Sequence, residues 1–222
     1  MTNAKKQILV VEDHPIFRLG LRELINQEPD MVVCGEAQDA GRAWQEITRL
    51  QPDLVIADIT LEDGDGIELT KRIKRHYKAM PVLILSLHDE FLYAERALHA
   101  GARGYIMKQE AMELVVTAAR QVLAGKIYLN EPMKEHILAN LSLPRQGREQ
   151  ISMERLTDRE LEVFSMIGQG LSTREIADKL NLSVKTIGTH RERIKVKLHL
   201  KNANELLRHA VHWARTGQLD AP

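Results

Sequence analysis

The stretch Asp53-Leu54-Val55-Ile56-Ala57-Asp58 decides the fold of this chain, because it is a short apolar run that ends at a polar residue, and the pattern occurs three more times. The other runs are Gln7 to Val11, followed by Glu12 and Asp13; Pro81 to Leu85, followed by Ser86; and Arg103 to Met107, followed by Lys108. Short apolar runs that alternate with amphipathic stretches are typical of a parallel sheet buried on both faces. Such sheets bind their ligands outside the carboxyl ends of the strands. We therefore expect an α/β fold in which these polar strand ends converge on one site.

Five strand-helix units followed by an all-helical tail make up the predicted architecture. Strands are expected near residues 7–12, 31–37, 53–57, 81–86 and 103–107, and helices near 15–27, 39–50, 65–76, 89–100 and 110–124. Residues 142–150 are polar and broken by Pro and Gly, which indicates a tether. Capping boxes at Thr157–Glu160 and Ser172–Glu175 then open apolar-periodic runs, and Ser183 and Asn202 cap two further helices. The prediction is a five-stranded, doubly wound parallel sheet of flavodoxin-like type over residues 6–124, a linker over 125–152 with a helix near 131–141, and a four-helix domain over 153–216.

The distribution of charge separates the two parts of the chain. The 222 residues have a formal net charge of zero, but residues 1–150 carry 19 Lys and Arg against 22 Asp and Glu, whereas residues 151–222 carry 12 against 9. The basic excess is densest from Arg191 to Lys201, which predicts a polyanionic partner for the second part alone. No apolar run reaches the roughly 18 residues of a membrane span, the amino terminus lacks the pattern of a signal peptide, and Cys34 is the only cysteine. We therefore expect a cytoplasmic protein without a membrane segment or a disulfide framework.

The polar strand ends form a candidate acyl-phosphate site. Glu12, Asp13 and Asp58 are expected to lie close together, and three neighbouring carboxylates require a cation or a bound proton at neutral pH. Mg²⁺ is the expected cofactor because it prefers hard oxygen ligands. A carboxylate can then attack phosphorus, while Lys108 and the Ser86 hydroxyl hold the transferred oxygens.

At these residues the chain resembles the response-regulator receiver domain, over roughly residues 6–124. The resemblance implies that Asp58 accepts a phosphoryl group from a histidine kinase, and that the Thr60 carbonyl joins the three acids in binding Mg²⁺. It implies that three further residues sense the phosphorylated state: Ser86, Tyr105 and Lys108. One departure is visible, because the family usually has a Pro-Gly turn after the phosphoacceptor and this chain has Glu62-Asp63. These acids could alter phosphodonor preference, metal affinity or the lifetime of the phosphoaspartate.

The segment from Ser172 to Lys197 carries a second candidate site. A short helix, the tight turn Asn181-Leu182 and a basic-edged helix that begins after Ser183 follow one another there. This is the pattern of a helix-turn-helix, whose second helix enters the major groove of DNA. The expected buried stripe of that helix is Val184, Ile187, Ile194 and Leu198. The expected contacts to double-stranded DNA, with cations at phosphates and the central face at bases, are Ser183, Lys185, Thr186, Gly188, Thr189, His190, Arg191, Arg193, Lys195 and Lys197. Gly188 is unfavourable in a helix interior by up to about 1 kcal/mol relative to Ala, which is explained if it permits close approach to the groove.

This segment also resembles the LuxR-type DNA-binding domain, from about Leu156 to Trp213. The matching residues are Leu156 to Val163, Gly170 to Ser172, Glu175 to Ala177 and Ser183 to His190. Together with the receiver, the chain is similar to a NarL/FixJ-type response regulator. The resemblance implies that the helix near Ala203 to Trp213 pairs two copies on a two-fold DNA site. It further implies that phosphorylation favours homodimerisation and DNA binding, so that the protein regulates transcription and is not a turnover enzyme.

Three alternatives remain open from the sequence. A phosphohydrolase of haloacid-dehalogenase-like type would also use Asp58 as its nucleophile, but such enzymes usually need a second Asp two residues on, where this chain has Thr60. The receiver could serve as a protein-binding module that is independent of phosphate, and Glu62-Asp63 keeps this alternative alive. The helical tail could be a charged bundle that binds another protein.

Overall fold

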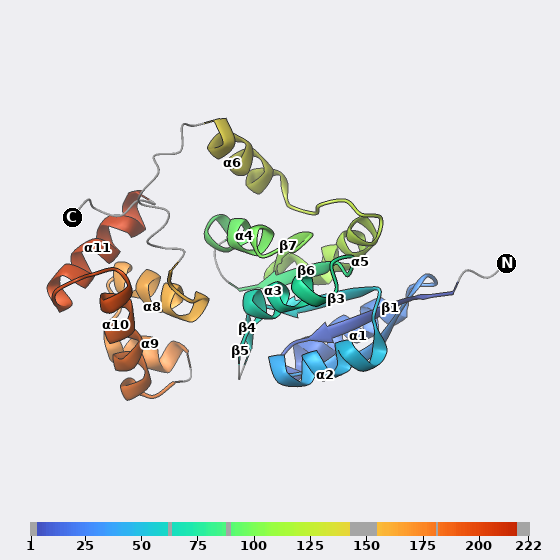
Figure 1. Cartoon of the computed structure of the whole chain (residues 1–222), viewed down its shortest axis with the longest axis horizontal. Coiled ribbons are helices and arrows are strands. Elements are labelled where there is room, and N and C mark those ends of the chain that lie inside the picture. Colours follow the sequence, from blue (N-terminus) through green and yellow to red (C-terminus); the bar gives the residue numbers. More distant parts are fainter. Residues whose placement is uncertain (1–3, 62–63, 88–89, 143–154, 181, 217–222) are drawn as a thin grey trace. The chain divides into compact units, whose positions relative to one another are not determined.

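The structure, a computed structural model, describes residues 4–61, 64–87, 90–142, 155–180 and 182–216 (Figure 1). The chain divides into two compact units, Met1–Leu143 and Pro144–Pro222. Three features of the sequence lie outside the described residues: the Glu62-Asp63 departure, residues 143–150 of the expected tether, and Asn181 of the expected tight turn.

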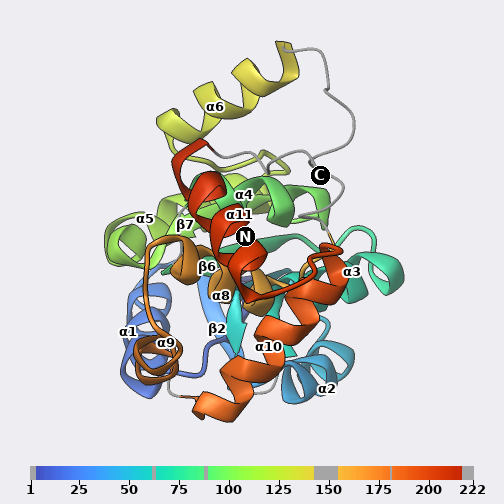
Figure 2. The same cartoon turned by 90° about the vertical axis from the view of Figure 1, so that its left-hand side faces the viewer.

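The first unit is a parallel sheet covered by helices. In chain order, its first elements are β1 (Lys6–Val11), α1 (Pro15–Asn26), β2 (Met31–Ala37), α2 (Ala40–Leu50), β3 (Leu54–Asp58), β4 (Thr60–Leu61), β5 (Gly64–Asp65) and α3 (Gly66–His76). The rest are β6 (Val82–Ser86), α4 (Glu90–His99), β7 (Gly104–Met107), α5 (Lys108–Leu123) and α6 (Glu131–Ser142). The five long strands are parallel in the order β2-β1-β3-β6-β7. Helices α1 and α5 contact each other, as do α2 and α3, and the two pairs lie on opposite sides of the sheet (Figure 2). The predicted doubly wound, five-stranded α/β fold is confirmed.

The register of the sheet explains why the polar strand ends meet. Strands β3 and β6 are buried along their whole length, as apolar strands between two helical layers should be. Val11 pairs with Ala57 and Asp58 pairs with Leu85, so the residues that follow β1 lie level with the end of β3. Ser86 pairs with Met107, which places the first residue of α5 at the same edge. Parallel pairing alone therefore brings the polar residues at the strand ends to one edge of the sheet.

Two local features differ from the sequence prediction. Thr60 and Leu61 form a small antiparallel ladder with Gly64 and Asp65. Strands of two residues are too short to be predicted from the periodicity of the sequence. Helix α5 begins at Lys108, two residues before the predicted start at 110, so Lys108 belongs to the helix rather than to the turn. The Asp65 side chain accepts hydrogen bonds from the N–H groups of Ile67 and Glu68 and caps α3.

The second unit is a small helical domain. Its described helices are α8 (Asp158–Gly168), α9 (Thr173–Lys179), α10 (Val184–Lys197) and α11 (Ala203–Thr216). Both predicted capping boxes are formed, at Thr157 with Glu160 and at Ser172 with Glu175. Helix α10 packs on α8 and α9, and α11 packs on α8 (Figure 2). The core is formed by Leu161, Phe164, Ile167, Ile176, Ile187, Ile194, Leu206 and Ala210. The predicted four-helix, helix-turn-helix architecture is confirmed.

Within the described part of the chain, no helix combines the length and the apolar character needed to cross a membrane.

Candidate functional site

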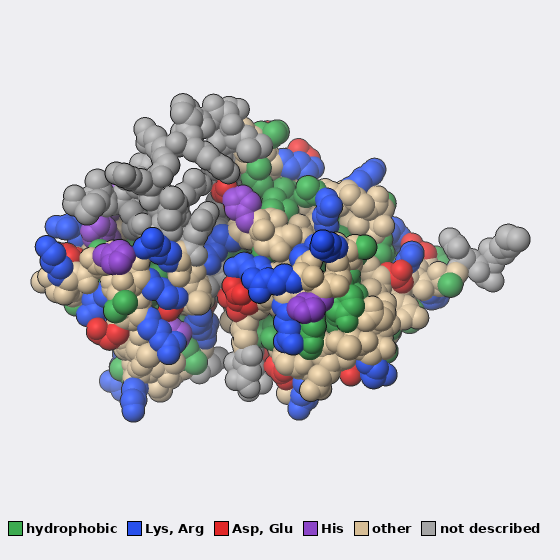
Figure 3. Space-filling view, viewed as in Figure 1, with side chains coloured by type: hydrophobic (Ala, Val, Ile, Leu, Met, Phe, Trp, Pro, Cys, Tyr) green, Lys and Arg blue, Asp and Glu red, His purple; other side chains and the backbone are tan. Residues whose placement is uncertain are grey.

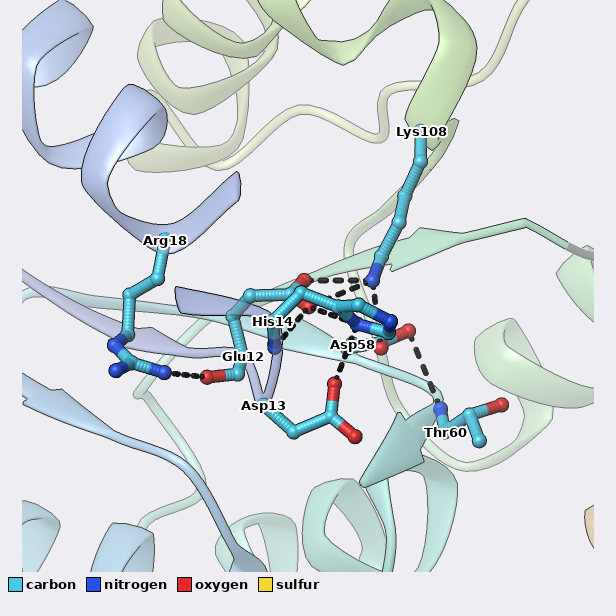
Figure 4. Close-up of polar contacts among 7 residues, drawn as sticks. All are labelled: Glu12, Asp13, His14, Arg18, Asp58, Thr60 and Lys108. Carbon is cyan, nitrogen blue, oxygen red and sulfur yellow. Dashed lines mark hydrogen bonds and ion pairs between the residues drawn. The ribbon is translucent and has the colours of Figure 1, made fainter. Parts of the chain in front are cut away.

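A buried cluster of two carboxylates and one ammonium group lies at the carboxyl edge of the sheet (Figure 4). Lys108 Nζ lies 2.7 Å from Asp58 Oδ2 and 2.7 Å from Glu12 Oε2. Glu12 is fully buried, and Asp58 and Lys108 are 3% and 6% exposed. The three residues come from the ends of β1 and β3 and from the start of α5, which are separated by up to 96 positions in the sequence. The parallel sheet therefore creates a charged centre from distant segments.

Asp13 and His14 widen this cluster toward the solvent. One donor atom from each of Glu12, Asp13, His14 and Asp58 lies within 4.8 Å of the others. His14 Nδ1 is 2.7 Å from Asp13 Oδ1 and 3.1 Å from Glu12 Oε1. Three carboxylates face one ammonium group, so the cluster has an excess of negative charge when all of them are ionised. The predicted gathering of Glu12, Asp13 and Asp58 is present in the structure, whereas His14 was not expected to join it.

Burial controls the protonation of this centre. Burial raises the pKa of Asp58 to about 7, with Glu12 adding to the rise and Lys108 opposing it. Burial alone would lower the pKa of Lys108, but the carboxylates of Asp58 and Glu12 outweigh it, and the pKa is raised. Lys108 is therefore cationic at neutral pH, while Asp58 is close to its titration point. A further cation would favour the carboxylate form of Asp58.

The donor set fits a hard divalent cation. Oxygen ligands in excess of the local positive charge are the environment that Mg²⁺ selects. The side chain of Asp13 is 21% exposed, and among the described residues its buried Oδ1 contacts His14 Nδ1. Glu12, Asp13 and Asp58 are thus the side chains that could hold the ion.

The other predicted residues of the first site occupy neighbouring positions. The Thr60 N–H donates to Asp58 Oδ1 over 3.2 Å, which helps to orient the carboxylate. Ser86 ends β6, the strand next to β3, and is fully buried. Tyr105 lies in β7, where it is 3% exposed and its N–H donates to the Tyr128 carbonyl.

Arg18 is a site residue that the sequence did not reveal. Its Nη1 donates to the Glu12 carbonyl over 2.6 Å, and its Nε donates to Glu36 Oε2 over 3.2 Å. The side chain thereby ties α1 to the ends of β1 and β2 and holds the backbone from which Glu12 and Asp13 project. A bond to a backbone carbonyl leaves no pattern in the sequence, and the one available signal was a basic residue one turn into a helix beside the acids.

Helix α10 presents one buried face and one polar face. Ile187 and Ile194 are fully buried against the rest of the second unit. The prediction that Val184 belongs to the buried stripe is wrong, because Val184 is 52% exposed. It is the first residue of the helix, and the buried stripe begins one turn later. The Ser183 hydroxyl accepts from the Thr186 N–H over 3.0 Å and caps the helix.

The predicted DNA-contact residues of α10 differ in accessibility. Those exposed to solvent are Ser183, Lys185, Thr189 and Arg193, and those partly buried are Thr186, Gly188, His190, Arg191, Lys195 and Lys197. Burial and, after it, the charge of Arg159 lower the pKa of His190, so its ring is neutral at pH 7. Lys195 pairs with Glu192 over 2.9 Å, and Lys197 pairs over 2.5 Å with Glu160 of α8, whose side chain is 3% exposed. Figure 3 shows Lys and Arg side chains at several places on the face of the second unit turned to the viewer.

The chain carries an acidic, lysine-containing centre in its first unit and a helix-turn-helix in its second. Comparison with known families agrees: residues 8–120 match the response regulator receiver domain, and residues 154–210 match the bacterial regulatory proteins of the luxR family. The chain belongs to the response regulators that join a receiver domain to a LuxR-type helix-turn-helix, the NarL family. It is a two-component transcription regulator that binds DNA through the helix-turn-helix, and it is not a turnover enzyme.

Relatives of known name cover nearly the whole chain. The transcriptional activator protein ExaE of Pseudomonas putida is 36% identical over 204 residues, which are 92% of this chain and 95% of ExaE. The oxygen regulatory protein NreC of Staphylococcus carnosus is 33% identical over 210 residues, which are 92% of this chain and 96% of NreC. A structure of two RcsB dimers bound to two parallel DNAs is similar with a TM-score of 0.57 and 26% identity, over 92% of this chain and 96% of RcsB.

Proposed function

We propose that Asp58 is the phosphoacceptor of this response regulator and that a histidine kinase supplies the phosphoryl group. The observation that carries the proposal is the buried contact of Lys108 with both Asp58 and Glu12. We further propose that Glu12, Asp13, Asp58 and the Thr60 carbonyl bind Mg²⁺, an ion that would neutralise charge on the incoming phosphoryl group. The regulator acts in the cytoplasm, where its DNA lies.

In this mechanism a carboxylate oxygen of Asp58 attacks phosphorus and the phosphodonor leaves. The attacking form is the carboxylate, and because burial raises the pKa of Asp58, positive charge beside it increases the fraction of Asp58 that is ionised. Lys108 donates to the transferred oxygens from its present position beside Asp58. The Ser86 hydroxyl is proposed to move toward the phosphoryl group, and Tyr105 to follow it.

The phosphorylated state is proposed to form a homodimer that binds DNA. The new group adds about two negative charges to a site that already has an excess of carboxylates. The proposed domains are the receiver over residues 6–124, a linker over 125–152 with a helix near 131–141, and the DNA-binding domain over 153–216. The proposed contacts lie on and around α10: Ser183, Lys185, Thr186, Gly188, Thr189, His190, Arg191, Arg193, Lys195 and Lys197. RcsB dimers on DNA support this arrangement by similarity.

The decisive experiment follows the intact mass and the oligomeric state of the full chain after treatment with acetyl phosphate and Mg²⁺. Wild type is expected to gain one phosphoryl group and to dimerise, and Asp58→Asn to do neither. Asp53→Asn is the matched control, because Asp53 precedes the same strand at its opposite end and pairs with exposed Lys6. It should behave like wild type.

Each other outcome points to a different function. A mass gain that persists in Asp58→Asn would exclude Asp58 as the acceptor. A mass gain without any change in association or DNA affinity would refute the proposed switch. Dimerisation and DNA binding that are the same with and without the phosphodonor would favour a receiver that only binds other proteins. Continuous phosphate release from a small phosphoester would favour the hydrolase alternative.

A further inference from the structure

The end of helix α3 carries exposed cations that have no part in the proposed phosphorylation mechanism. Residues 66–80 contain five Lys and Arg against one acid, although the first 150 residues carry more acids than bases. Figure 3 shows Lys, Arg and His side chains gathered over α3. Four exposed residues form what we call the α3 patch: Arg72 and Arg75 of the helix, Lys78 just beyond it, and Arg103 before β7.

The members of the α3 patch lie around Lys74. Its Nζ donates to the carbonyls of Lys78 over 2.8 Å and Met80 over 2.9 Å, so Lys74 closes the end of the helix. Burial and, after it, the charge of Arg103 lower the pKa of Lys74, which indicates that Arg103 lies near this turn of α3. A Cβ added to Gly101 would lie 2.6 Å from Lys74 Cγ, so the segment that leads to Arg103 packs against the helix.

The cations of the α3 patch lack the carboxylate partners that other cations of the first unit have. Five arginines elsewhere in this unit pair with Asp or Glu: Arg18, Arg22, Arg42, Arg49 and Arg120. Glu68, the acid of α3, pairs with Lys71 over 2.6 Å. Among the described residues, no carboxylate lies within ion-pair distance of a member of the patch. Gathered cations without counter-charges attract a polyanion.

Arg72 is oriented before any partner binds. Its Cζ lies 3.9 Å from the centre of the Trp44 ring. His76 packs edge-on against the same ring at 5.0 Å, and its Nδ1 lies 2.9 Å from the Arg72 carbonyl oxygen. A guanidinium stacked on an aromatic face keeps the N–H groups in its plane available to phosphate oxygens and loses less conformational freedom on binding them. Arg72 therefore has the geometry of a phosphate contact.

We propose that the α3 patch is a second contact surface for duplex DNA, which binds backbone phosphates beside the sequence that α10 reads. The chain binds DNA through its helix-turn-helix. Residues 143–154 are all that separate α6 from the described start of the second unit, so bound DNA has a high effective concentration at the first unit. A duplex is thereby favoured over an acidic protein as the partner. Phosphate contacts carry no base specificity, so this surface adds affinity on any flanking sequence.

The α3 patch is separate from the phosphorylation site. Gly66, the first residue of α3, lies against the Asp58 carbonyl, whereas the patch begins past the middle of the helix and continues beyond its end. A helix of 11 residues is about 16 Å long. The inference therefore goes beyond the proposed phosphorylation mechanism and does not depend on it.

The test compares two variants of the full chain that lose the same charge. One removes three cations of the patch: Arg72→Gln, Arg75→Gln and Arg103→Gln. The control removes three arginines that pair with carboxylates: Arg22→Gln, Arg42→Gln and Arg49→Gln. Affinity is measured over a range of salt concentrations on a duplex selected from random sequences by the unsubstituted chain. This duplex is used with and without about ten base pairs of flanking DNA, one helical turn, on each side.

The patch variant is expected to lose about tenfold in affinity for the flanked duplex at low salt. The slope of log affinity against log salt should become shallower by about two to three, because each phosphate contact contributes roughly 0.9. On the trimmed duplex the patch variant should bind like wild type, and the control variant should match wild type on both. In an otherwise unsubstituted chain, benzoylphenylalanine in place of Arg75 should photo-crosslink to the flanking DNA, and benzoylphenylalanine in place of Arg42 should not.

Two results would overturn the proposal. Equal loss of affinity on the flanked and trimmed duplexes, without a crosslink from position 75, would mean that the substitutions disturb the fold or the dimer rather than a DNA contact. An unchanged salt slope on the flanked duplex, again without a crosslink, would exclude DNA and leave an acidic protein as the partner of the patch.

Discussion

Replacing Gly188 by Ala should separate the stability of the second unit from its affinity for DNA. Gly188 lies inside α10, and a Cβ added there would have no atom within 4 Å outside its chain neighbours and the backbone of its own helix. Packing within the folded chain therefore gives no reason for a glycine. If the space beside Gly188 is filled by DNA in the complex, the methyl group will stabilise the free protein and weaken the complex.

The expected gain in stability follows from helix propensity. Gly is about 0.8–1.0 kcal/mol less favourable than Ala in a helix interior, and no clash offsets this difference. For a domain of this size, 1 kcal/mol corresponds to a rise in Tm of roughly 4–8 °C. We expect DNA affinity to fall by about tenfold, which corresponds to about 1.4 kcal/mol.

Tryptophan fluorescence can report the second unit by itself. The chain has two tryptophans, and Trp213 packs on Phe164 in the second unit with ring centroids 5.7 Å apart. Thermal unfolding is therefore measured in a Trp44→Phe background, where Trp213 is the sole tryptophan. DNA affinity is measured in the same protein with a fragment selected from random sequences by the unsubstituted chain.

Gly168→Ala is the matched control for the same chemical change. A Cβ on Gly168 would lie 2.3 Å from the Ala210 carbonyl oxygen, so α8 and α11 could no longer pack as they do. This variant should lower Tm. An unchanged or lower Tm for Gly188→Ala would contradict the presence of free space beside Gly188. Unchanged DNA affinity would refute a role of Gly188 in close approach to the groove.

Three further predictions concern other parts of the chain. Lys197→Met should lower the free energy of unfolding of the second unit by about 2 kcal/mol in chemical denaturation, because the buried Glu160 loses its partner, although Lys197 is itself partly exposed. Burial would raise the pKa of Glu160, but Lys197 and the Thr157 N–H outweigh burial and the pKa is lowered. The stabilisation from the ion pair is therefore complete above the ordinary pKa of Glu and is lost as the pH falls below it. The difference in unfolding free energy between Lys197→Met and wild type should close over the same fall in pH. Gly66→Ala should destabilise the first unit and reduce phosphoryl uptake by intact mass, since its Cβ would lie 2.0 Å from the Asp58 carbonyl oxygen; normal uptake would contradict this reasoning. DNA affinity should fall with salt, and Lys185→Ala should reduce the slope of that dependence by about one; an unchanged slope would remove Lys185 from the phosphate contacts.

Much of the first unit could be predicted because its information is local. Each central strand is a short apolar run with a polar residue at its end, and parallel pairing sends all such ends to one edge. The meeting of Glu12, Asp58 and Lys108 follows from this rule without knowledge of any distance. Each capping box of the second unit likewise lies within four consecutive residues, so it can be read directly from the sequence.

The features that escaped prediction depend on contacts between distant segments. Lys197 reaches Glu160 across 37 positions, and a basic residue near the end of a helix has many other possible partners. Arg18 binds a backbone carbonyl, which has no side chain to mark it. Val184 has the right periodicity for burial but lies one turn before the buried stripe begins. Periodicity indicates which face of a helix is apolar, not how far its neighbours cover it.

The position of Lys108 after the last strand of the sheet has a consequence for the newly made protein. Synthesis proceeds from the amino terminus, so Glu12, Asp13 and Asp58 emerge well before the lysine, which follows Asp58 by 50 positions. Until β7 adds to the edge of the sheet, the acids lack the ammonium group that balances them. A stalled or truncated chain therefore carries Asp58 and Glu12 without the lysine that contacts both. Under the proposed mechanism, a chain without β7 and Lys108 would not be phosphorylated at Asp58, so that phosphorylation would require a complete sheet.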